Sequence, residues 1–128
     1  MIPITARAEL RPGSRIVTVD AHGCGKIRHV LPVVPGACPV SKNPISGTAS
    51  IVYRPNGRAL EAVSLFDAFR WAMSGAREAP RSVEDLARWL AVEACAAVGV
   101  QVAVRLDIII NPGPQRIVVD HAVLPRDA

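Results

Sequence analysis

Two segments in the middle of this chain carry apolar residues at helical spacing, and strand-like segments flank the pair on both sides. From Glu61 to Ser74 the apolar residues recur every three or four positions, and Gly75 interrupts the pattern. A second helix is predicted from its N-cap Ser82 to Gly99, with Asp85 three residues after the cap. The inner face of this second helix is predicted to consist of Val83, Leu86, Leu90 and Ala94.

The segments around the helical pair have the composition and alternation of β-strands. Strands are predicted at Ser14 to Ala21, Lys26 to Val34, Thr48 to Arg54, Val100 to Ile110 and Gln115 to Leu124. The order of strands, two helices and strands predicts an α+β fold in which both helices pack on one face of an antiparallel sheet. Residues 1–128 are expected to form a single domain, with residues 1–13 as an extended arm.

Composition excludes several classes of protein. Half of the 128 residues are apolar and a fifth are charged, which is typical of a folded domain rather than a disordered chain. No apolar run is long enough to span a bilayer, and the N-terminal residues have no signal-peptide pattern, so we expect a cytoplasmic protein without a membrane partner. Three cysteines do not suggest a disulfide framework. A dispersed net charge of +4 does not by itself indicate nucleic-acid binding.

The candidate nucleophile is Cys38, which lies in the turn-rich stretch Pro35-Gly36-Ala37-Cys38-Pro39. Proline and glycine restrict the backbone there, so the thiol is expected on a loop rather than in the core. A thiol in such a position can act as a nucleophile once it is deprotonated. The alternative interpretation is a small apolar residue without chemistry, since cysteine is among the most buried residue types.

A carboxylate at the start of the second helix is the candidate binding residue. Glu84 can accept two parallel hydrogen bonds and so recognise the amidine edge of a guanine-like ring. An acid in a first helical turn is also stabilised by the helix dipole, which is the structural alternative. Glu61, Ser64 and Leu65, at the start of the first helix, are further candidates, and capping alone would also explain the first two.

Together, Cys38-Pro39-Val40-Ser41, the Glu61-Ala62-Val63-Ser64-Leu65 segment and Glu84 resemble the nitrile reductase (QueF) family of the tunnelling-fold (T-fold) superfamily, over about Leu31 to His121. The resemblance implies a T-fold whose subunits close a barrel, hence a homo-oligomer. It also implies a deazaguanine-type substrate, 7-cyano-7-deazaguanine, either free or as part of tRNA. Cys38 would then form a covalent thioimide, Glu84 would anchor the heterocycle, and Glu61, Ser64 and Leu65 would line the ligand site.

Four positions differ from the reductases that this chain resembles. Their general-acid aspartate corresponds to Ile45, their NADPH-binding lysines to Val63 and Phe66, and a histidine to Val83. An apolar side chain can neither deliver a proton nor neutralise a phosphate. The cofactor therefore stays open: NADPH would serve reduction to the aminomethyl product, whereas amidine formation with ammonia, as in archaeosine-forming relatives, needs no such lysines. A non-catalytic deazapurine- or pterin-binding module and a purely structural oligomer are the alternatives.

Two other groups of residues are given structural interpretations. His22, Cys24 and His29 fit no standard zinc spacing, so no metal site is expected. Trp71 and Trp89 fall at helical positions and are expected in the core or at an interface.

Overall fold

The computed structural model describes residues 16–33, 36–37, 44–110 and 115–128. The arm expected at residues 1–13 and the candidate nucleophile Cys38 lie outside these ranges. The α+β class expected from the sequence is confirmed. In chain order the elements are β1 (Thr18–Ala21), β2 (Ile27–Pro32), β3 (Gly36–Ala37), β4 (Pro44–Tyr53), β5 (Gly57–Leu60), α2 (Ala62–Ala72), α3 (Val83–Val98), β6 (Val102–Ile110), β7 (Gln115–Val123) and the short 3-10 helix η1 (Pro125–Asp127).

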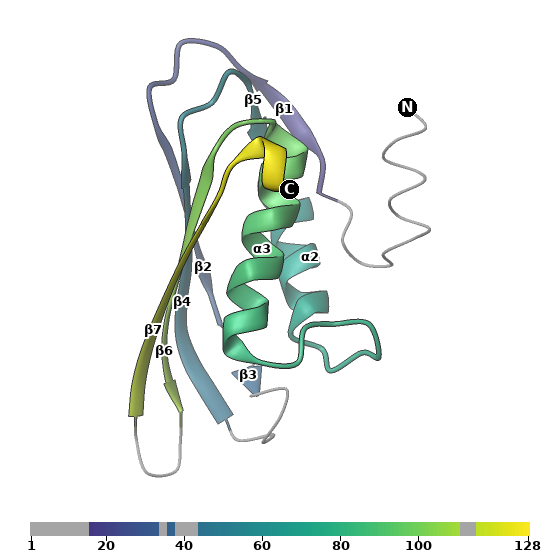
Figure 1. The fold of residues 1–128 in the computed structure, drawn as a ribbon, viewed down its shortest axis with the longest axis vertical. Helices are drawn as coiled ribbons and strands as arrows, with labels where there is room; N and C mark the ends of the chain where they lie inside the picture. The colour runs from purple at the N-terminus through teal and green to yellow at the C-terminus, as the bar shows by residue number, and fades with distance from the viewer. Residues whose placement is uncertain (1–15, 34–35, 38–43, 111–114) are drawn as a thin grey trace.

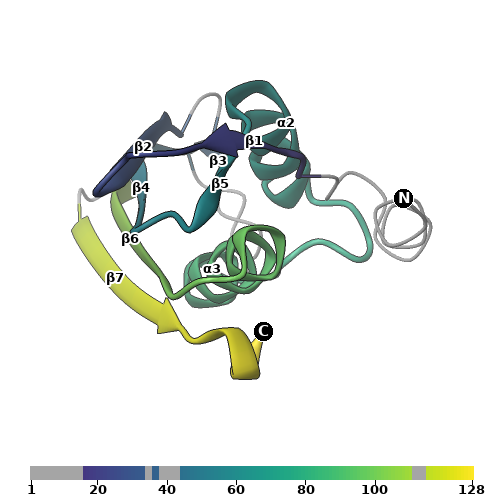
Figure 2. The same ribbon diagram turned by 90° about the horizontal axis from the view of Figure 1, so that it is seen from above.

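The main sheet is antiparallel and has the strand order β2-β4-β6-β7, with the short β3 paired to the start of β4. Both helices lie on the same side of this sheet (Figures 1 and 2). Helix α3 packs against β6 and β7. A second, two-stranded sheet formed by β1 and β5 lies beside the start of α2. Among the described residues, β2 and β7 are thus the outer long strands of the main sheet.

Strand β6 shows how alternation in the sequence produces the two faces of the sheet. Its core-facing residues are at most 2% exposed: Val102, Val104, Leu106 and Ile108. The residues between them point to the other face, where Arg105 pairs with Asp120 at 2.7 Å and Arg116 pairs with Asp107 at 2.8 Å. Because successive side chains of a strand alternate in direction, one face joins the helices and the other meets solvent.

Both helices begin close to where the sequence predicts. The Ser82 hydroxyl accepts a hydrogen bond from the Asp85 backbone N–H at 3.0 Å, as expected for the N-cap of α3. Gly99 ends α3 in the left-handed conformation, with φ of 73°. Helix α2 has Glu61 as its N-cap and ends at Ala72, slightly before the predicted Ser74. The predicted inner face of α3 is buried, which confirms the helical pattern: Val83, Leu86, Leu90 and Ala94.

Strand β3 lies where the sequence predicts only turns, and it pairs with the start of β4. Two further strands differ from the prediction for the same reason. Strand β5 has no counterpart among the predicted strands, and it forms because it pairs with the distant β1. Strand β4 begins at Pro44 rather than Thr48, because its first residues pair with β3 and with the end of β6. In both cases the pairing partner, rather than the local alternation of residues, determines where the strand lies.

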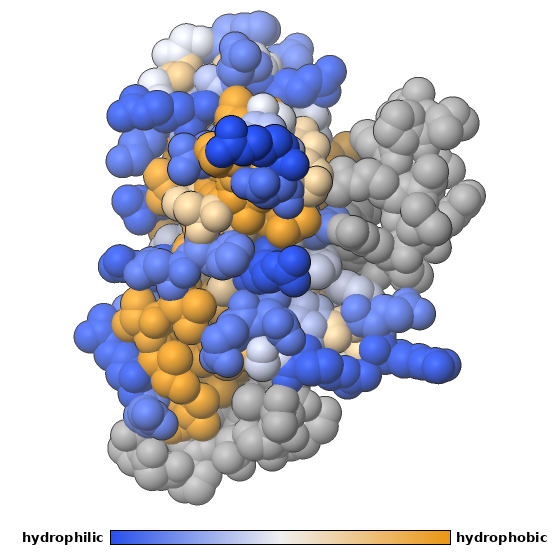
Figure 3. Space-filling model, viewed as in Figure 1, coloured by the Kyte–Doolittle hydropathy of each residue, from blue (hydrophilic) through white to orange (hydrophobic). Residues whose placement is uncertain are grey.

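Some large apolar side chains stay on the surface. Among the described residues, those with the highest exposure are Val19, Val30, Val63, Ile109 and Val118. Val30, Ile109 and Val118 alternate with core-facing neighbours, so they lie on the sheet face that points away from the helices. Figure 3 shows apolar surface over the lower part of the β6–β7 region. Neither α2 nor α3 has the length and apolar character that a membrane-crossing helix requires.

Candidate functional site

Glu84 lies in the first turn of α3, and its side chain is exposed. Helix α3 runs antiparallel to β6, because β6 begins soon after α3 ends and packs back along it. Strand β6 in turn ends at Ile110, which is paired with Ile45 near the start of β4. Glu84 therefore lies at the end of the main sheet where β4 begins, the lower end in Figure 1.

The chain that carries Cys38 connects two described positions at this same end. Ala37 in β3 and Pro44 in β4 are paired across the strands, and residues 38–43 join them. Cys38 itself lies outside the described residues. Both flanking positions nevertheless lie at the Glu84 end of the sheet.

Glu61 and Ser64 make contacts that hold the start of α2. The Glu61 carboxylate accepts hydrogen bonds from the backbone N–H of Val63 at 2.7 Å and of Ser64 at 2.9 Å. These bonds hold the pKa of the Glu61 carboxyl below its usual value. The Ser64 hydroxyl accepts from the Val17 N–H at 3.0 Å and donates to the Glu61 carbonyl oxygen. Leu65 is fully buried in the core.

The start of α2 lies far from Glu84 within one chain. The Leu60 backbone N–H donates to the Tyr53 hydroxyl at 2.8 Å, so this start lies beside the last residue of β4. Glu84 lies near the first residue of that strand. Since a ten-residue strand spans roughly 30 Å, Glu61, Ser64 and Leu65 do not join Glu84 in a single site of one chain. Only a site shared between chains could combine them.

At four positions the sequence analysis expects a difference from the nitrile reductases, and all four side chains are apolar. Two of them lie in the core and two lie on α2. Ile45 and Val83 are each 5% exposed and belong to the core. Val63 is 67% exposed on α2. The Arg70 guanidinium carbon lies over the Phe66 ring, 5.9 Å from the centroid of that ring. None of these side chains can hold a phosphate or transfer a proton.

His29 takes part in a hydrogen-bonded aromatic pair rather than a metal site. Its Nε2 lies 2.9 Å from the Tyr53 hydroxyl, and the two rings stack with centroids 5.6 Å apart. Burial lowers the pKa of His29. Cys24 is exposed. Within the part of the chain that the structure describes, no three His, Cys, Asp or Glu side chains are arranged to hold a metal ion.

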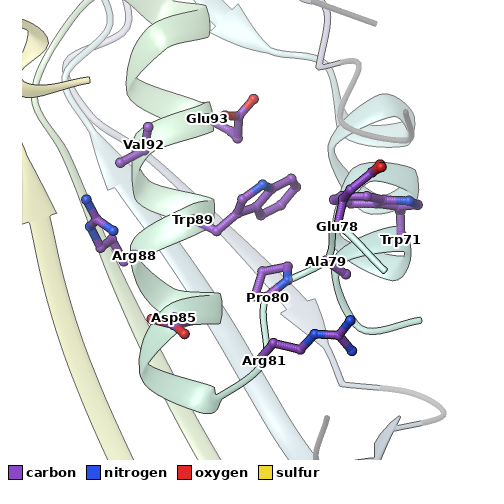
Figure 4. A pocket seen from close by; sticks show the side chains of 10 residues that line it. All are labelled: Trp71, Glu78, Ala79, Pro80, Arg81, Asp85, Arg88, Trp89, Val92 and Glu93. Atoms are coloured by element: carbon purple, nitrogen blue, oxygen red, sulfur yellow. The ribbon is translucent and has the colours of Figure 1, made fainter. Parts of the chain in front are cut away.

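A cavity of about 490 Å³ between the two helices is a site that the sequence interpretation missed. Figure 4 shows that Trp71 of α2 and Trp89 of α3 both contribute to its wall. The sequence offered one signal for this cavity, because the two tryptophans of the chain lie on the two predicted helices. The sequence analysis interpreted both as core or interface residues, so it did not predict a cavity. The fully buried Glu93 also lines it, and no motif in the sequence singled that residue out.

Comparison of this chain with protein-family models and with curated proteins finds no match in either set.

Proposed function

We propose that this chain is a QueF-like enzyme of the T-fold type that acts on the nitrile of 7-cyano-7-deazaguanine. In this proposal Cys38 is the nucleophile and Glu84 anchors the deazaguanine ring. The observation that carries the proposal is the position of Glu84, which is exposed at the end of the sheet where residues 38–43 join β3 to β4. A nucleophile and a heterocycle anchor must be close together, and Ala37 and Pro44, which flank residues 38–43, lie at the same end of the sheet as Glu84.

The layout of the fold supports the T-fold part of the proposal. Two strands, two helices and two strands follow one another as β2, β4, α2, α3, β6 and β7. Their sheet order is the same as their chain order, and both helices lie on one side. Such a unit leaves outer strands available for pairing with other copies. A barrel of several subunits would also bring Glu61, Ser64 and Leu65 of one chain toward Glu84 of another.

The chemistry begins with addition of the Cys38 thiolate to the nitrile carbon. A carbon–sulfur bond forms, one π bond of the nitrile breaks, and the nitrogen takes a proton from water, which gives a thioimide. Attack of ammonia on the thioimide carbon then breaks the carbon–sulfur bond, releases the thiolate, returns one proton to water and leaves an amidine, without any reductant. Because Val63 and Phe66 cannot neutralise the phosphate of NADPH, amidine formation suits this chain better than reduction to the aminomethyl product.

A non-catalytic deazapurine- or pterin-binding module is the second candidate. Ile45, at the position of the family's general acid, is 5% exposed and lies in the core. A chain without a proton donor there could keep a pocket and bind its ligand without reacting. The substrate in either case is a free heterocycle or the same heterocycle as part of tRNA.

The intact mass of the protein after incubation with 7-cyano-7-deazaguanine tests the proposal. We expect one ligand mass per chain in the wild type and in Cys24→Ala and Cys95→Ala, and none in Cys38→Ala. Cys24 is an exposed thiol and so tests nonspecific addition. Cys95 is buried, donates its Sγ–H to the Val100 carbonyl oxygen, and has a pKa raised by burial, so it should stay unreactive.

The outcomes separate the candidates. Tight binding by calorimetry without a mass increase would favour the binding module. Labelling that persists in Cys38→Ala would contradict the assignment of the nucleophile. With the adduct established, saturable NADPH oxidation would restore reduction, while a new amidine in the presence of ammonium would support the amidine route.

A further inference from the structure

The positive charges of this chain are scattered along the sequence, but the fold gathers several of them at one end of the open face of the main sheet. This face points away from the two helices (Figure 2). Lys26 precedes β2, Arg28 lies within it, Arg54 follows β4 and Arg105 lies in β6, and all four residues are exposed. They surround the last residues of β4, the upper end in Figure 1, whereas Glu84 lies near the beginning of that strand.

Two adjoining hollows lie among these basic residues. One has a volume of about 350 Å³ and the other of about 320 Å³. Val52 and Ala103 line both hollows, so together they form one continuous trough. The charged residues of its lining are Lys26, Arg28, Arg54, Arg105 and Asp120.

The strand register explains the shape of the trough. Val52 of β4 is paired with Arg28 of β2 on one side and with Ala103 of β6 on the other. One step further along the same face, Ser50 is paired with Arg105. Residues two apart in a strand share a face, so short side chains in the centre lie between long basic ones.

The acidic side chains on this part of the face are already neutralised. Asp120 accepts two hydrogen bonds from the Arg105 guanidinium, at 2.7 and 3.3 Å. Asp107, two residues after Arg105 in β6, accepts two from Arg116, at 2.9 and 2.8 Å. Such bidentate pairs use the acceptor oxygens that would otherwise compete for the remaining cations.

The remaining cations have free hydrogen-bond donors. Within the part of the chain that the structure describes, Lys26 and Arg28 have no acidic partner. Arg54 donates to the Gly25 carbonyl oxygen at 3.4 Å, which uses one of its five N–H groups. The trough therefore has an excess of positive charge and of N–H donors, which favours an anionic ligand rich in oxygen.

From this arrangement we infer a second ligand site that takes a short linear chain of linked phosphates. Because neighbouring strands lie about 4.8 Å apart, the cations of β2 and β6 are separated by roughly 10 Å across β4. A linear polyanion can contact cations on both sides of that strand at once, whereas a single compact anion cannot. Guanidinium and ammonium groups are the usual partners of phosphate oxygens.

The lining also indicates that the phosphate chain, rather than a nucleobase, is recognised. Tyr53 is the aromatic residue among those that line the trough, and it is only 3% exposed. Its hydroxyl accepts from the Leu60 N–H on the helix side of the sheet. The described lining therefore offers no ring on which a base could stack.

This trough is separate from the site of the proposed nitrile chemistry. Its lining includes none of Glu84, Glu61, Ser64 and Leu65. Helix α2, which carries Ser64 and Leu65, lies on the other side of the sheet (Figure 2). Failure of one site would thus leave the other untouched.

Calorimetric titration with inorganic tripolyphosphate tests the site. Citrate, a compact polyanion, and orthophosphate, a single phosphate, are the controls. At constant ionic strength we expect saturable binding of tripolyphosphate and a rise in the unfolding temperature. Citrate and orthophosphate should bind at least about tenfold more weakly, because neither can contact the cations of both strands.

Three variants locate the binding. Arg28→Gln and Arg54→Gln each remove one exposed charge from the trough, and each should weaken tripolyphosphate binding roughly three- to tenfold. Arg126→Gln removes the same charge from η1, outside the trough, and should leave the affinity unchanged. All three positions are exposed, so the variants are expected to fold, and circular dichroism checks this.

Four results would overturn the inference. Citrate that binds as tightly as tripolyphosphate would show general attraction of anions rather than a site for a chain. No saturable heat and no rise in unfolding temperature would show that the site does not exist. Undiminished affinity in both Arg28→Gln and Arg54→Gln would place binding elsewhere. A short oligouridine that binds more tightly than tripolyphosphate, and loses affinity in the same variants, would identify a nucleic-acid surface instead.

Discussion

At the scale of single residues, Glu61 illustrates how a side chain can match a binding motif and still have a structural role. Its carboxylate caps α2 through the N–H groups of Val63 and Ser64. Ser64 extends the same junction to the segment before β1 through the Val17 N–H. These bonds join two parts of the chain that are distant in sequence, so the residues are needed for the fold whether or not they also contact a ligand.

The cap predicts a pH dependence of stability. Because folding lowers the pKa of Glu61, its stabilisation is present above the unfolded-state value and is lost as the pH falls through the folded value. We expect the difference in unfolding free energy between wild type and Glu61→Gln to be largest at neutral pH. It should shrink as the pH falls below about 4.5. Urea unfolding of both proteins across this range measures it, and a constant difference would contradict the capping role.

Glu84 gives a second prediction at this scale, which rests on the proposed function. Glu84→Gln should weaken binding of 7-cyano-7-deazaguanine by roughly ten- to a hundredfold, because one charge-assisted contact of the pair is lost. Calorimetry measures the affinity, and Asp85→Asn, the neighbouring exposed acid, is the matched control. Unchanged affinity in Glu84→Gln would show that another residue anchors the ligand.

At the scale of elements, β4 is the central strand that ties the sheet together. It pairs with β2 and β3 on one edge and with β6 on the other. Gly47 lies in the crowded part of this strand, where its carbonyl oxygen accepts from the Val33 N–H at 3.0 Å. With φ of 137°, and with the Asp107 carbonyl and Ile108 Cα where a Cβ would be, only glycine fits without a shift of the backbone.

Alanine substitutions at two glycines test this explanation. Gly99→Ala, at the end of α3, puts a Cβ into open space and should cost about 1 kcal/mol of unfolding free energy for the left-handed backbone alone. Gly47→Ala adds a backbone clash with β6, so we expect a loss on the order of 3 kcal/mol. Denaturant titration compares the two. Equal losses would show that the close approach of β4 and β6 relaxes easily.

At the scale of the whole molecule, the main sheet leaves both surfaces and edges that suit assembly. In the described structure β7 pairs only with β6, and Val118 is 45% exposed on the open face. Exposed strand edges with apolar residues tend to pair with other chains unless they are covered. The surface is thus consistent with the homo-oligomer that the proposed T-fold requires.

Assembly is tested by sedimentation and by one added charge. We expect the wild type to sediment as a single oligomer larger than a dimer. Val118→Lys, on the outer strand, should shift it toward smaller species because a charge is placed at the edge. Gln101→Lys adds the same charge at an exposed position outside the strands and should have no effect. A wild type that sediments as a monomer would contradict the barrel.

The features that could be predicted from the sequence are those that depend on interactions between residues close together in the chain. The caps Ser82 and Gly99, the inner face of α3 and the alternation of β6 depend on residues a few positions apart, so the sequence predicts them. Local spacing predicts only the place of Glu84 in a first helical turn. Its candidacy as a binding residue comes from the resemblance to the nitrile reductases and stays a prediction. The function of Cys38 stays a prediction, since that residue lies outside the described structure.

By itself, then, the amino-acid sequence determined the α+β class, the two helices and most strands, because local periodicity and capping suffice for them. Only the tertiary structure decided that β5 pairs with β1, that Glu61 and Glu84 lie at opposite ends of the sheet, and that Glu93 is buried beside two tryptophans. These features arise from contacts between segments far apart in the chain. No local pattern specifies such contacts, because they depend on how the helices and strands pack together.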